Sequence, residues 1–398
     1  MDKRQLFLNN VAQTSELSMG LEVSRAEGMY IYDSSGKEYL DLNSGISVSS
    51  LGHLNPRVVN AVHDQLQRYM HTMVYGEHIQ NPQLIFAQRI LPLMGEAFEK
   101  VYFLMSGTEA VELGVKIGRL YTGRYEVLAS KNAYHGSTIG AESLRSDLDF
   151  TKYMAPGVPG IGHIEFNNED SLNKITEKTA CVITEVVQAE SGINSPEPAF
   201  LEALRKRCTE KGAILIFDEI QTGFFRTGSL FAYKKYNCIP DVVLAGKAMG
   251  GGMPVSAVFS SNDIMSAIIK NPALAHITTF GGHPVCIAAA TACLEELLEK
   301  GIGAKVEAKE ALFKKLLVHP IIKEVRTNGL MMAVELKKRK YLKHVVEHTI
   351  KNGALIDYFL FNNRSFRLAP PLIIEEDQIR DACNILLASM DYAQGLYK

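Results

Sequence analysis

The 398-residue chain lacks several features that would assign it to a specialised class of protein. No apolar run approaches the length of a membrane span, and the first residues contain no apolar segment long enough for a signal peptide. The formal charge of −2 gives no electrostatic reason to expect nucleic acid or an anionic membrane as a partner. We therefore expect a cytoplasmic protein that binds neither nucleic acid nor membrane.

Motifs for metals and nucleotides are missing as well. The chain has no HExxH or CxxC spacing, and its scattered cysteines indicate reduced thiols; they are Cys181, Cys208, Cys238, Cys286, Cys293 and Cys383. Gly246-Lys247 is no Walker A loop, because Asp241 stands where the first glycine should be. Residues 157–162 have their glycines in the wrong order for a dinucleotide fingerprint. We expect no bound metal.

What the chain does contain is an ordinary enzyme composition, with 46% apolar and 22% charged residues. From about residue 100 to 260, apolar segments alternate with helical ones, which favours an α/β fold with a mostly parallel sheet covered by helices on both faces. The expected strands are Val101–Met105, Val127–Ala129, Cys181–Thr184, Ile214–Phe217, Val242–Ala245 and Val255–Phe259.

The chain changes character after a helical stretch at about 284–300. Short strands and helices follow, and strand-like pieces also occur before residue 45. We expect a large domain of residues 46–285 and a smaller α+β domain built from residues 1–45 and 286–398. The other expected helices are at about 56–70, 82–94, 304–317, 340–352 and 375–393.

Two apolar runs end in side chains that carry chemistry. Ala213–Phe217 leads to Asp218, and Val242–Ala245 leads to Gly246 and Lys247. Because parallel strands present their carboxyl ends at one edge of a sheet, we expect the carboxylate and the amine at the same site. This pair suits pyridoxal phosphate, since a desolvated amine can form a Schiff base with the aldehyde while a carboxylate keeps the ring nitrogen protonated. Taken alone, Asp218 could also be a helix cap or a salt-bridge partner.

Two turns could complete such a site. Ser106-Gly107-Thr108 follows a predicted strand and opens a helix, so its backbone N–H groups form a ready anion site. Tyr134-His135-Gly136 offers a flat face for stacking and a glycine that allows close approach. Gln221 could donate a hydrogen bond to the phenolic oxygen of the ring. The alternatives are an ordinary capped helix for the first turn and a surface loop for the second.

With these motifs, the chain resembles the class III aminotransferases, the group that contains ornithine, acetylornithine and 4-aminobutyrate aminotransferases. The similarity runs from Gly45–Ser47 and Leu51–His53 to Arg367–Leu372, and it is densest at Ile216–Gly252. The resemblance implies a fold type I pyridoxal-phosphate-dependent transferase whose large domain contains a mostly parallel seven-stranded sheet. It also implies a homodimer with the active site at the subunit interface.

The resemblance also implies a role for each matching residue. Lys247 resembles the Schiff-base lysine and proton shuttle, and Asp218 resembles the partner of the pyridine nitrogen. Tyr134 resembles the residue that stacks on the ring, and Thr279 resembles the threonine that reaches the phosphate of the other subunit's cofactor. The remaining expected cofactor contacts are Ser106, Gly107, Thr108, His135, Glu185 and Gln221.

Substrate contacts follow from the same resemblance. Arg367 resembles the carboxylate-binding arginine of the family, and its planar fork suits that task; the alternative is an ion pair within the C-terminal domain. Glu190 resembles the glutamate that pairs with this arginine when a substrate lacks a carboxylate there. One position departs from the family, since Ser137 stands where a substrate-gripping arginine usually follows the aromatic-His-Gly motif. Arg145 could replace it, although we expect Arg145 to be a surface residue.

These residues predict ping-pong transfer of a terminal amino group from an amino acid or amine to a 2-oxo acid, with 2-oxoglutarate as the expected acceptor. The nearest alternative is an aminomutase or racemase on the same fold, which would give no net transfer to an oxo acid. A non-catalytic binding protein is the distant alternative, and the presence of Lys247 and Asp218 argues against it. Residues 134–138 also resemble diaminopelargonate-type members, which leaves a long-chain amine donor open.

Overall fold

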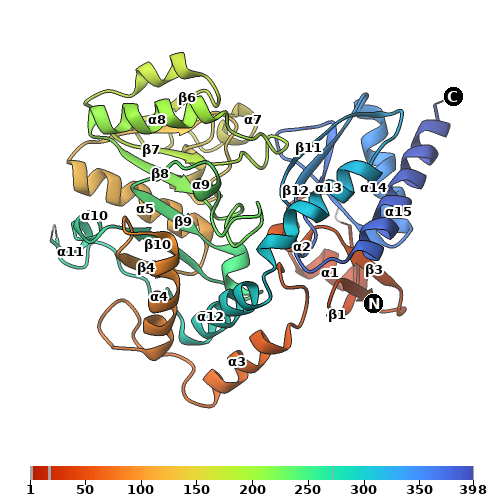
Figure 1. Ribbon diagram of the computed structural model, residues 1–398, viewed down its shortest axis with the longest axis horizontal. Helices are drawn as coiled ribbons and strands as arrows, with labels where there is room; N and C mark the ends of the chain where they lie inside the picture. Colours follow the sequence, from red (N-terminus) through yellow and green to blue (C-terminus); the bar gives the residue numbers. More distant parts are fainter. Residues whose placement is uncertain (1–2, 17–18, 271, 398) are drawn as a thin grey trace.

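A seven-stranded sheet runs through one half of the molecule, with the strand order β4-β10-β9-β8-β7-β5-β6 (Figure 1). The computed structural model describes residues 3–16, 19–270 and 272–397. Strands β5 to β9 pair in parallel, whereas β10 is antiparallel to both β4 and β9. The strands are β4 (Lys100–Leu104), β5 (Glu126–Ser130), β6 (Ile161–Ile164), β7 (Thr179–Glu185), β8 (Ile214–Asp218), β9 (Val242–Ala245) and β10 (Ser256–Ser260).

Alternate residues of these strands face different hydrophobic cores. In β8, Ile214 and Ile216 pack in one cluster with residues of α5, whereas Leu215 and Phe217 join a larger cluster with residues of α8 and α12. Every residue of β8 is buried, as expected for a parallel strand that is covered on both faces. The helices are α5 (Gly107–Thr122), α8 (Pro198–Lys211) and α12 (Pro284–Glu299).

The other half of the molecule contains two four-stranded sheets, with the orders β11-β12-β15-β14 and β1-β2-β3-β13. Strand β13 pairs in parallel with β3, so the N-terminal strands lie beside the C-terminal third of the chain (Figure 1). These elements are β1 (Val23–Glu27), β2 (Tyr30–Asp33), β3 (Glu38–Asp41), β11 (Ile322–Asn328), β12 (Met331–Leu336), β13 (Ala354–Leu355), β14 (Asp357–Tyr358), β15 (Ser365–Leu368), α13 (Val306–Leu316), α14 (Leu342–Lys351) and α15 (Glu376–Gly395).

Shorter or peripheral elements complete the fold. They are α1 (Lys3–Asn10), α2 (Ser44–Ser47), α3 (Pro56–Leu66), α4 (Asn81–Met94), α6 (Ile139–Ser143), α7 (Leu148–Thr151), α9 (Ala232–Lys235), α10 (Asn262–Met265), α11 (Ala267–Lys270) and the 3₁₀ turns η1 (Glu169–Lys174), η2 (Lys247–Gly250), η3 (Gly303–Lys305) and η4 (Arg339–Tyr341). Among the described residues, no helix is long and apolar enough to cross a membrane.

The predicted mostly parallel seven-stranded sheet with flanking helices is confirmed. Strands β1 and β6 and helix α1 were not predicted. The division into a large domain of residues 46–285 and a small domain of residues 1–45 and 286–398 stays a prediction. Residues 1, 2, 17, 18 and 398 of that small domain lie outside the described residues.

Candidate active site

Three neighbouring strands bring charged side chains to one edge of the large sheet. Strand β7 ends at Glu185, β8 ends at Asp218, and β9 is followed by Gly246 and Lys247. The strand register places Asp218 beside Glu185 on one side and beside Leu244 on the other. The carboxyl ends of these parallel strands therefore bring together the carboxylate and the amine on which the predicted site depends.

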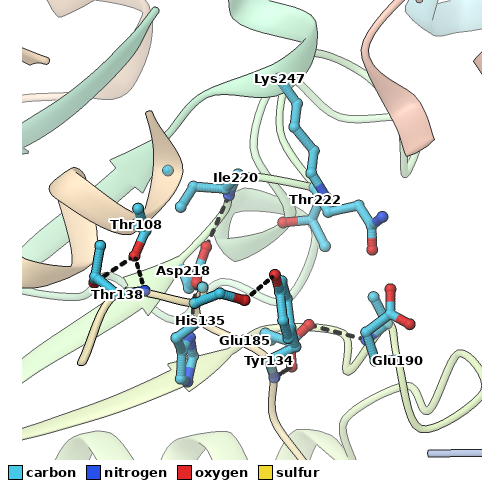
Figure 2. A pocket seen from close by; sticks show the side chains of 15 residues that line it. Thr108, Tyr134, His135, Thr138, Glu185, Glu190, Asp218, Ile220, Thr222 and Lys247 are labelled. Carbon is cyan, nitrogen blue, oxygen red and sulfur yellow. Dashed lines mark hydrogen bonds and ion pairs between the residues drawn. The ribbon is translucent and has the colours of Figure 1, made fainter. Parts of the chain in front are cut away.

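These side chains line a cavity of about 490 Å³ at this edge, where Lys247, Asp218, Tyr134 and Glu190 surround one space (Figure 2). This volume is typical of small-molecule sites. The predicted site residues that line it are Gly107, Thr108, Tyr134, His135, Glu185, Glu190, Asp218, Gln221 and Lys247. Lining residues that the sequence did not assign as contacts are Gly136, Ser137, Thr138, Ala189, Ile220 and Thr222, all of them within three positions of predicted ones along the chain.

The anion site at the start of α5 depends on a helix cap. The Ser106 hydroxyl accepts a hydrogen bond from the backbone N–H of Glu109, whose carboxylate in turn accepts one from the Ser106 N–H at 2.9 Å. This capping box fixes where the helix begins. Ser106 is thus the N-cap and does not line the cavity, whereas Gly107 and Thr108 of the first turn do.

A chain of hydrogen bonds fixes the side chain of Thr108. Its Oγ1 lies 2.7 Å from Thr138 Oγ1, and the Thr138 hydroxyl donates to Glu112 Oε1 at 2.6 Å. Gly136, at a φ of +127°, packs against the same threonine, and a Cβ at this position would lie 2.4 Å from Thr108 Oγ1. Glycine is therefore required for the close approach of the two turns.

His135 holds Asp218 in place. Its Nδ1 lies 2.7 Å from Asp218 Oδ2, and Asp218 Oδ1 accepts a hydrogen bond from the Ile220 N–H at 3.1 Å. Burial acts against the charged form of His135, but the Asp218 carboxylate outweighs it and raises the pKa of the imidazole. Nε2 of this buried ring has no partner among the described residues. The sequence predicted that both residues belong to the site, but not that they are bonded to each other.

Glu185 supports the walls of the cavity. Its carboxylate accepts hydrogen bonds from the backbone N–H of Tyr134 at 3.3 Å and of Ala189 at 3.0 Å. Burial raises the pKa of this carboxyl to about 7. Glu185 thus connects the loop that carries Tyr134 with the loop that carries Glu190.

Lys247 has an amine that is easily deprotonated. Burial, together with the charge of Arg367, lowers the pKa of Lys247 to about 8, although the carboxylates of Glu190, Asp218 and Glu185 oppose the shift. The residue has a φ of +47°, in the left-handed region that is unfavourable for a side chain of this size. A strained lysine with a lowered pKa is typical of a functional site.

A second pair of charges adjoins the cavity: Glu190 lines it, whereas its partner Arg367 does not. Arg367 of β15 donates from Nη2 to both carboxylate oxygens of Glu190, each at 2.7 Å, and both side chains are buried. The carboxylate of Glu190 also accepts a hydrogen bond from the Leu360 N–H at 3.1 Å. Nη2 of Arg367 also donates to the Tyr358 carbonyl at 3.1 Å, whereas Nε and Nη1 of this buried side chain have no partner among the described residues.

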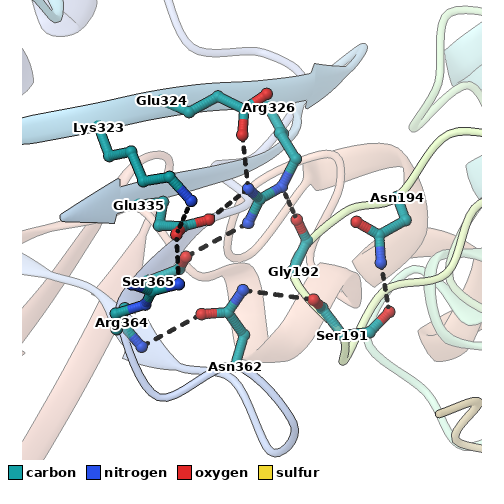
Figure 3. Close-up of polar contacts among 10 residues, drawn as sticks. All are labelled: Ser191, Gly192, Asn194, Lys323, Glu324, Arg326, Glu335, Asn362, Arg364 and Ser365. Atoms are coloured by element: carbon teal, nitrogen blue, oxygen red, sulfur yellow. Dashed lines mark hydrogen bonds and ion pairs between the residues drawn. The ribbon is translucent and has the colours of Figure 1, made fainter. Parts of the chain in front are cut away.

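The loop that carries Glu190 is hydrogen-bonded to a strand of the β11-β12-β15-β14 sheet. Arg326 of β11 donates to the Gly192 carbonyl at 2.7 Å and forms ion pairs with Glu324 and Glu335 at 2.8 and 2.5 Å (Figure 3). Asn362 donates to the Ser191 carbonyl at 3.4 Å. The position of Glu190 therefore depends on contacts between segments that are more than 100 residues apart.

The expectation that Arg145 is a surface residue is wrong. The side chain is buried, and its guanidinium pairs with Glu142 at 3.1 Å and with Asp147 at 3.0 Å. It also lies 4.2 Å from the ring centroid of Phe150. Ser137, at the position of the missing arginine, lines the cavity and contacts the Tyr134 hydroxyl at 3.1 Å. Arg145 does not line this cavity, and it is engaged by two carboxylates.

The remaining predicted contact, Thr279, lies on an exposed segment and does not line the cavity of its own chain. The other features fit pyridoxal phosphate. The cavity combines a lysine of lowered pKa, a buried carboxylate, a helix start for a phosphate and a required glycine beside it. Together with the sheet topology, they define a pyridoxal-phosphate-dependent enzyme of fold type I.

Comparison with known proteins defines the family. The chain is 35% identical over 381 residues to the [LysW]-aminoadipate semialdehyde/glutamate semialdehyde transaminase of Sulfolobus acidocaldarius, covering 92% of this chain and 94% of the relative. It is 36% identical over 361 residues to the acetylornithine aminotransferase of Methanopyrus kandleri, covering 89% and 90%. The structure of ornithine aminotransferase from Toxoplasma gondii superposes with a TM-score of 0.92 at 29% identity, over 98% and 94% of the chains.

A model of the family described as Aminotransferase class-III matches residues 11–390, and the chain belongs to this family. It is therefore an aminotransferase that uses pyridoxal phosphate to move an amino group from an amino acid to a 2-oxo acid. The predictions of family, fold type, enzyme class and cofactor are confirmed.

Proposed function

We propose that this enzyme takes the terminal amino group of an amino acid or amine and passes it to 2-oxoglutarate, with Lys247 and Asp218 as the catalytic residues. The observation that carries this proposal is one cavity that is lined by Lys247, Asp218 and Glu190, with Glu190 closed onto Arg367. Two relatives named for acetylornithine and for semialdehyde substrates support a group at the end of a carbon chain as the reacting one.

The cofactor would be held by residues of three turns. Pyridoxal phosphate supplies a conjugated ring that stabilises negative charge developing on the substrate carbon. The N–H groups at the start of α5 would hold its phosphate, with Gly107 and Thr108 in contact. Tyr134 would stack on the ring, and Gln221 would donate to its phenolic oxygen. Thr279 would reach the cofactor of the partner subunit, so we propose that the enzyme is a homodimer. We also propose that it is located in the cytoplasm.

Lys247 and Asp218 would have different roles in the reaction. With a pKa near 8, Lys247 Nζ can take up and release a proton close to neutral pH, as a general acid–base requires. Asp218 would keep the ring nitrogen protonated, and its bond to His135 fixes the direction in which the carboxylate points. Asp218 is buried and Lys247 is half-buried, so water screens their charges less than it would at the surface.

The Glu190–Arg367 pair would let one cavity accept two kinds of substrate. With the pair closed, Glu190 neutralises the guanidinium, and a donor without a carboxylate at this end can bind. When Glu190 moves away, Nε and Nη1 of Arg367, which have no partner among the described residues, can hold the carboxylate of glutamate or an oxo acid, while Nη2 keeps its bond to the Tyr358 carbonyl. This exchange suits a ping-pong sequence, in which the two substrates occupy the site in turn.

Spectroscopic half-reactions test the proposed function. Ornithine, acetylornithine, 4-aminobutyrate, lysine and diaminopelargonate would each be mixed with the enzyme, and conversion of the cofactor to its amine form would be followed by absorption. We expect terminal amines to convert the cofactor and 2-oxoglutarate to restore it. Restoration only by the carbonyl product of the donor itself would indicate an aminomutase and contradict the proposal.

Glu190→Gln should reverse the preference between the two substrate kinds. Glutamine can still accept a hydrogen bond from Arg367 but no longer neutralises its charge, so the pair opens more readily and we expect KM for 2-oxoglutarate to fall about tenfold, equivalent to ~1.4 kcal/mol. KM for a donor that lacks a carboxylate should rise, because it then binds beside a guanidinium whose charge is not neutralised. Steady-state kinetics of both half-reactions measure the change. Glu299→Gln, which removes a partner of Arg57 in α3 outside the cavity, is the matched control, and equal effects of both variants would contradict the proposed exchange.

The lowered pKa of Lys247 predicts how the cofactor-free enzyme responds to pH. Only the neutral amine reacts with an aldehyde, so the rate of pyridoxal phosphate uptake should rise with pH and level off above about 8. A lysine with an ordinary pKa of 10.5 would still be gaining reactivity at that point. Stopped-flow absorption gives the profile, with a free lysine derivative as the reference. A rate that keeps rising beyond pH 10 would show that the pKa is not lowered.

A further inference from the structure

The loop between β14 and β15, residues 359–364, lies along the segment that carries Glu190. The Phe361 N–H donates to the Glu190 carbonyl at 3.1 Å, and the Leu360 N–H donates to the Glu190 carboxylate at 3.1 Å. Two consecutive N–H groups of this β14–β15 loop therefore hold one residue of the cavity wall, both at its backbone and at its charged end.

The same part of the chain also contacts Arg367, the partner of Glu190. The Tyr358 carbonyl, at the end of β14, accepts a hydrogen bond from Nη2 at 3.1 Å. The ring centroid of the buried Phe359 lies 4.8 Å from the guanidinium carbon. Of these contacts, the one from Leu360 is the contact that reaches the Glu190 carboxylate, so it is the one that must break when the Glu190–Arg367 pair opens.

Phe361 connects the β14–β15 loop to the segment that follows α6. Its ring centroid lies 5.1 Å from the guanidinium carbon of Arg145, and its ring meets that of Phe150 edge to face at 6.5 Å. A cation over an aromatic face and an edge-to-face pair are both stabilising contacts. The guanidinium is itself fixed by ion pairs with Glu142 and Asp147. The aromatic ring of Phe361 therefore rests on a support that is held from two sides.

These contacts account for the burial of Arg145. Its guanidinium carbon lies within 6 Å of three ring centroids, at 4.2 Å from Phe150, 5.1 Å from Phe361 and 5.8 Å from Tyr134. A buried charge is costly unless its contacts compensate for it. Arg145 does not line the cavity, but it lies between Tyr134, which does, and the loop that holds Glu190.

We propose that Phe361 is a positioning residue that stabilises the closed Glu190–Arg367 pair and thereby sets how readily the enzyme accepts its 2-oxo acid. It acts through the Leu360 N–H, which its contact with Arg145 holds against the Glu190 carboxylate. Phe361 and Leu360 do not line the cavity. This inference rests on the proposed function, in which the closed pair admits the amino donor and the open pair admits the oxo acid.

Phe361→Leu tests the proposal, because leucine is apolar but offers no aromatic face to the guanidinium. Steady-state kinetics would use 2-oxoglutarate and the donor that converts the cofactor fastest in the half-reaction panel. We expect KM for 2-oxoglutarate to fall about fivefold, as loss of one aromatic contact allows. KM for the donor should change less than about twofold, because the closed pair remains the major state. A general structural defect would not improve the binding of one substrate.

Phe166→Leu is the matched control. Phe166 is also half-buried and in edge-to-face contact, with Phe200 at 5.5 Å, but it lies outside the cavity, and both KM values should stay as in the wild type. Arg145→Lys keeps the positive charge but loses the planar face, so KM for 2-oxoglutarate should fall in this variant too. An unchanged or raised KM for 2-oxoglutarate in Phe361→Leu, or an equal fall in Phe166→Leu, would overturn the proposal.

Glu190→Ala separates this inference from the proposed function. Without the carboxylate the pair cannot close, so KM for 2-oxoglutarate should fall, and adding Phe361→Leu should lower it no further. An unchanged KM in Glu190→Ala would overturn the proposed exchange and this inference with it. A KM that falls in Glu190→Ala but not in Phe361→Leu would overturn the inference alone, as would a fivefold fall on adding Phe361→Leu to Glu190→Ala.

Discussion

Lys247→Ala is expected to remove transamination and the visible absorption of the cofactor bound to the lysine, while the protein stays folded. Loss of a residue that acts both as the covalent anchor and as the proton carrier should lower kcat by at least about 10⁴-fold. The side chain contributes little to packing, because it projects into the cavity. Absorption spectra with and without added pyridoxal phosphate, single-turnover kinetics and circular dichroism measure the three parts of this result.

Lys309→Ala provides the matched control for Lys247→Ala. Lys309 is also a partly buried lysine whose pKa is lowered by burial, but it donates to the Leu372 carbonyl and lies outside the cavity. Its loss should leave the absorption band and the turnover in place. Near-normal activity of Lys247→Ala would remove the proposed catalytic role, whatever the fold of the protein.

Much of the large sheet and the centre of the site follow from local patterns. The apolar run before Asp218 is almost the same as β8, and the run before Lys247 coincides with β9. Strands that are buried on both faces produce continuous apolar runs, and this is the signal that places both residues at strand ends. Strand β6 was not predicted, because Gly162 and His163 interrupt its apolar character. The direction of β10, antiparallel to both of its neighbours, has no local signal.

The features that sequence reasoning could not supply depend on contacts between distant segments. Arg145 is buried because Phe361, more than 200 residues later, lies against its guanidinium along with local partners. The hydrogen bond between His135 and Asp218 joins the loop after β5 to the end of β8, and the two residues are 83 positions apart. Arg226 contacts segments on both sides of it in the sequence, at distances of 104 to 182 residues. Periodicity reports which face of an element is buried, but not which partner covers it.

Asp218→Asn is the second prediction with a large expected effect. Asparagine keeps the shape and can still accept a hydrogen bond from the Ile220 N–H, so the fold of the strand end should be preserved. The negative charge is lost, and with it the reason for the ring nitrogen to stay protonated. We expect kcat to fall by about 10³-fold, equivalent to about 4 kcal/mol of transition-state stabilisation. Asp391→Asn, which removes the exposed acid that pairs with His319, should have no such effect.

The pattern of kinetic loss distinguishes the charge of Asp218 from its role in structure. A lost charge at the ring nitrogen raises the barrier to proton removal from the substrate carbon, so a deuterium label on that carbon should slow Asp218→Asn more than the wild type. His135→Asn, which leaves the carboxylate but removes its bond at Nδ1, should cause a smaller loss because the charge remains. If both variants lost the same activity and showed the same isotope effect, orientation rather than charge would be the contribution of Asp218. The position of a charged residue at the end of β8 would then matter less than the contact it makes with the loop of Tyr134-His135-Gly136.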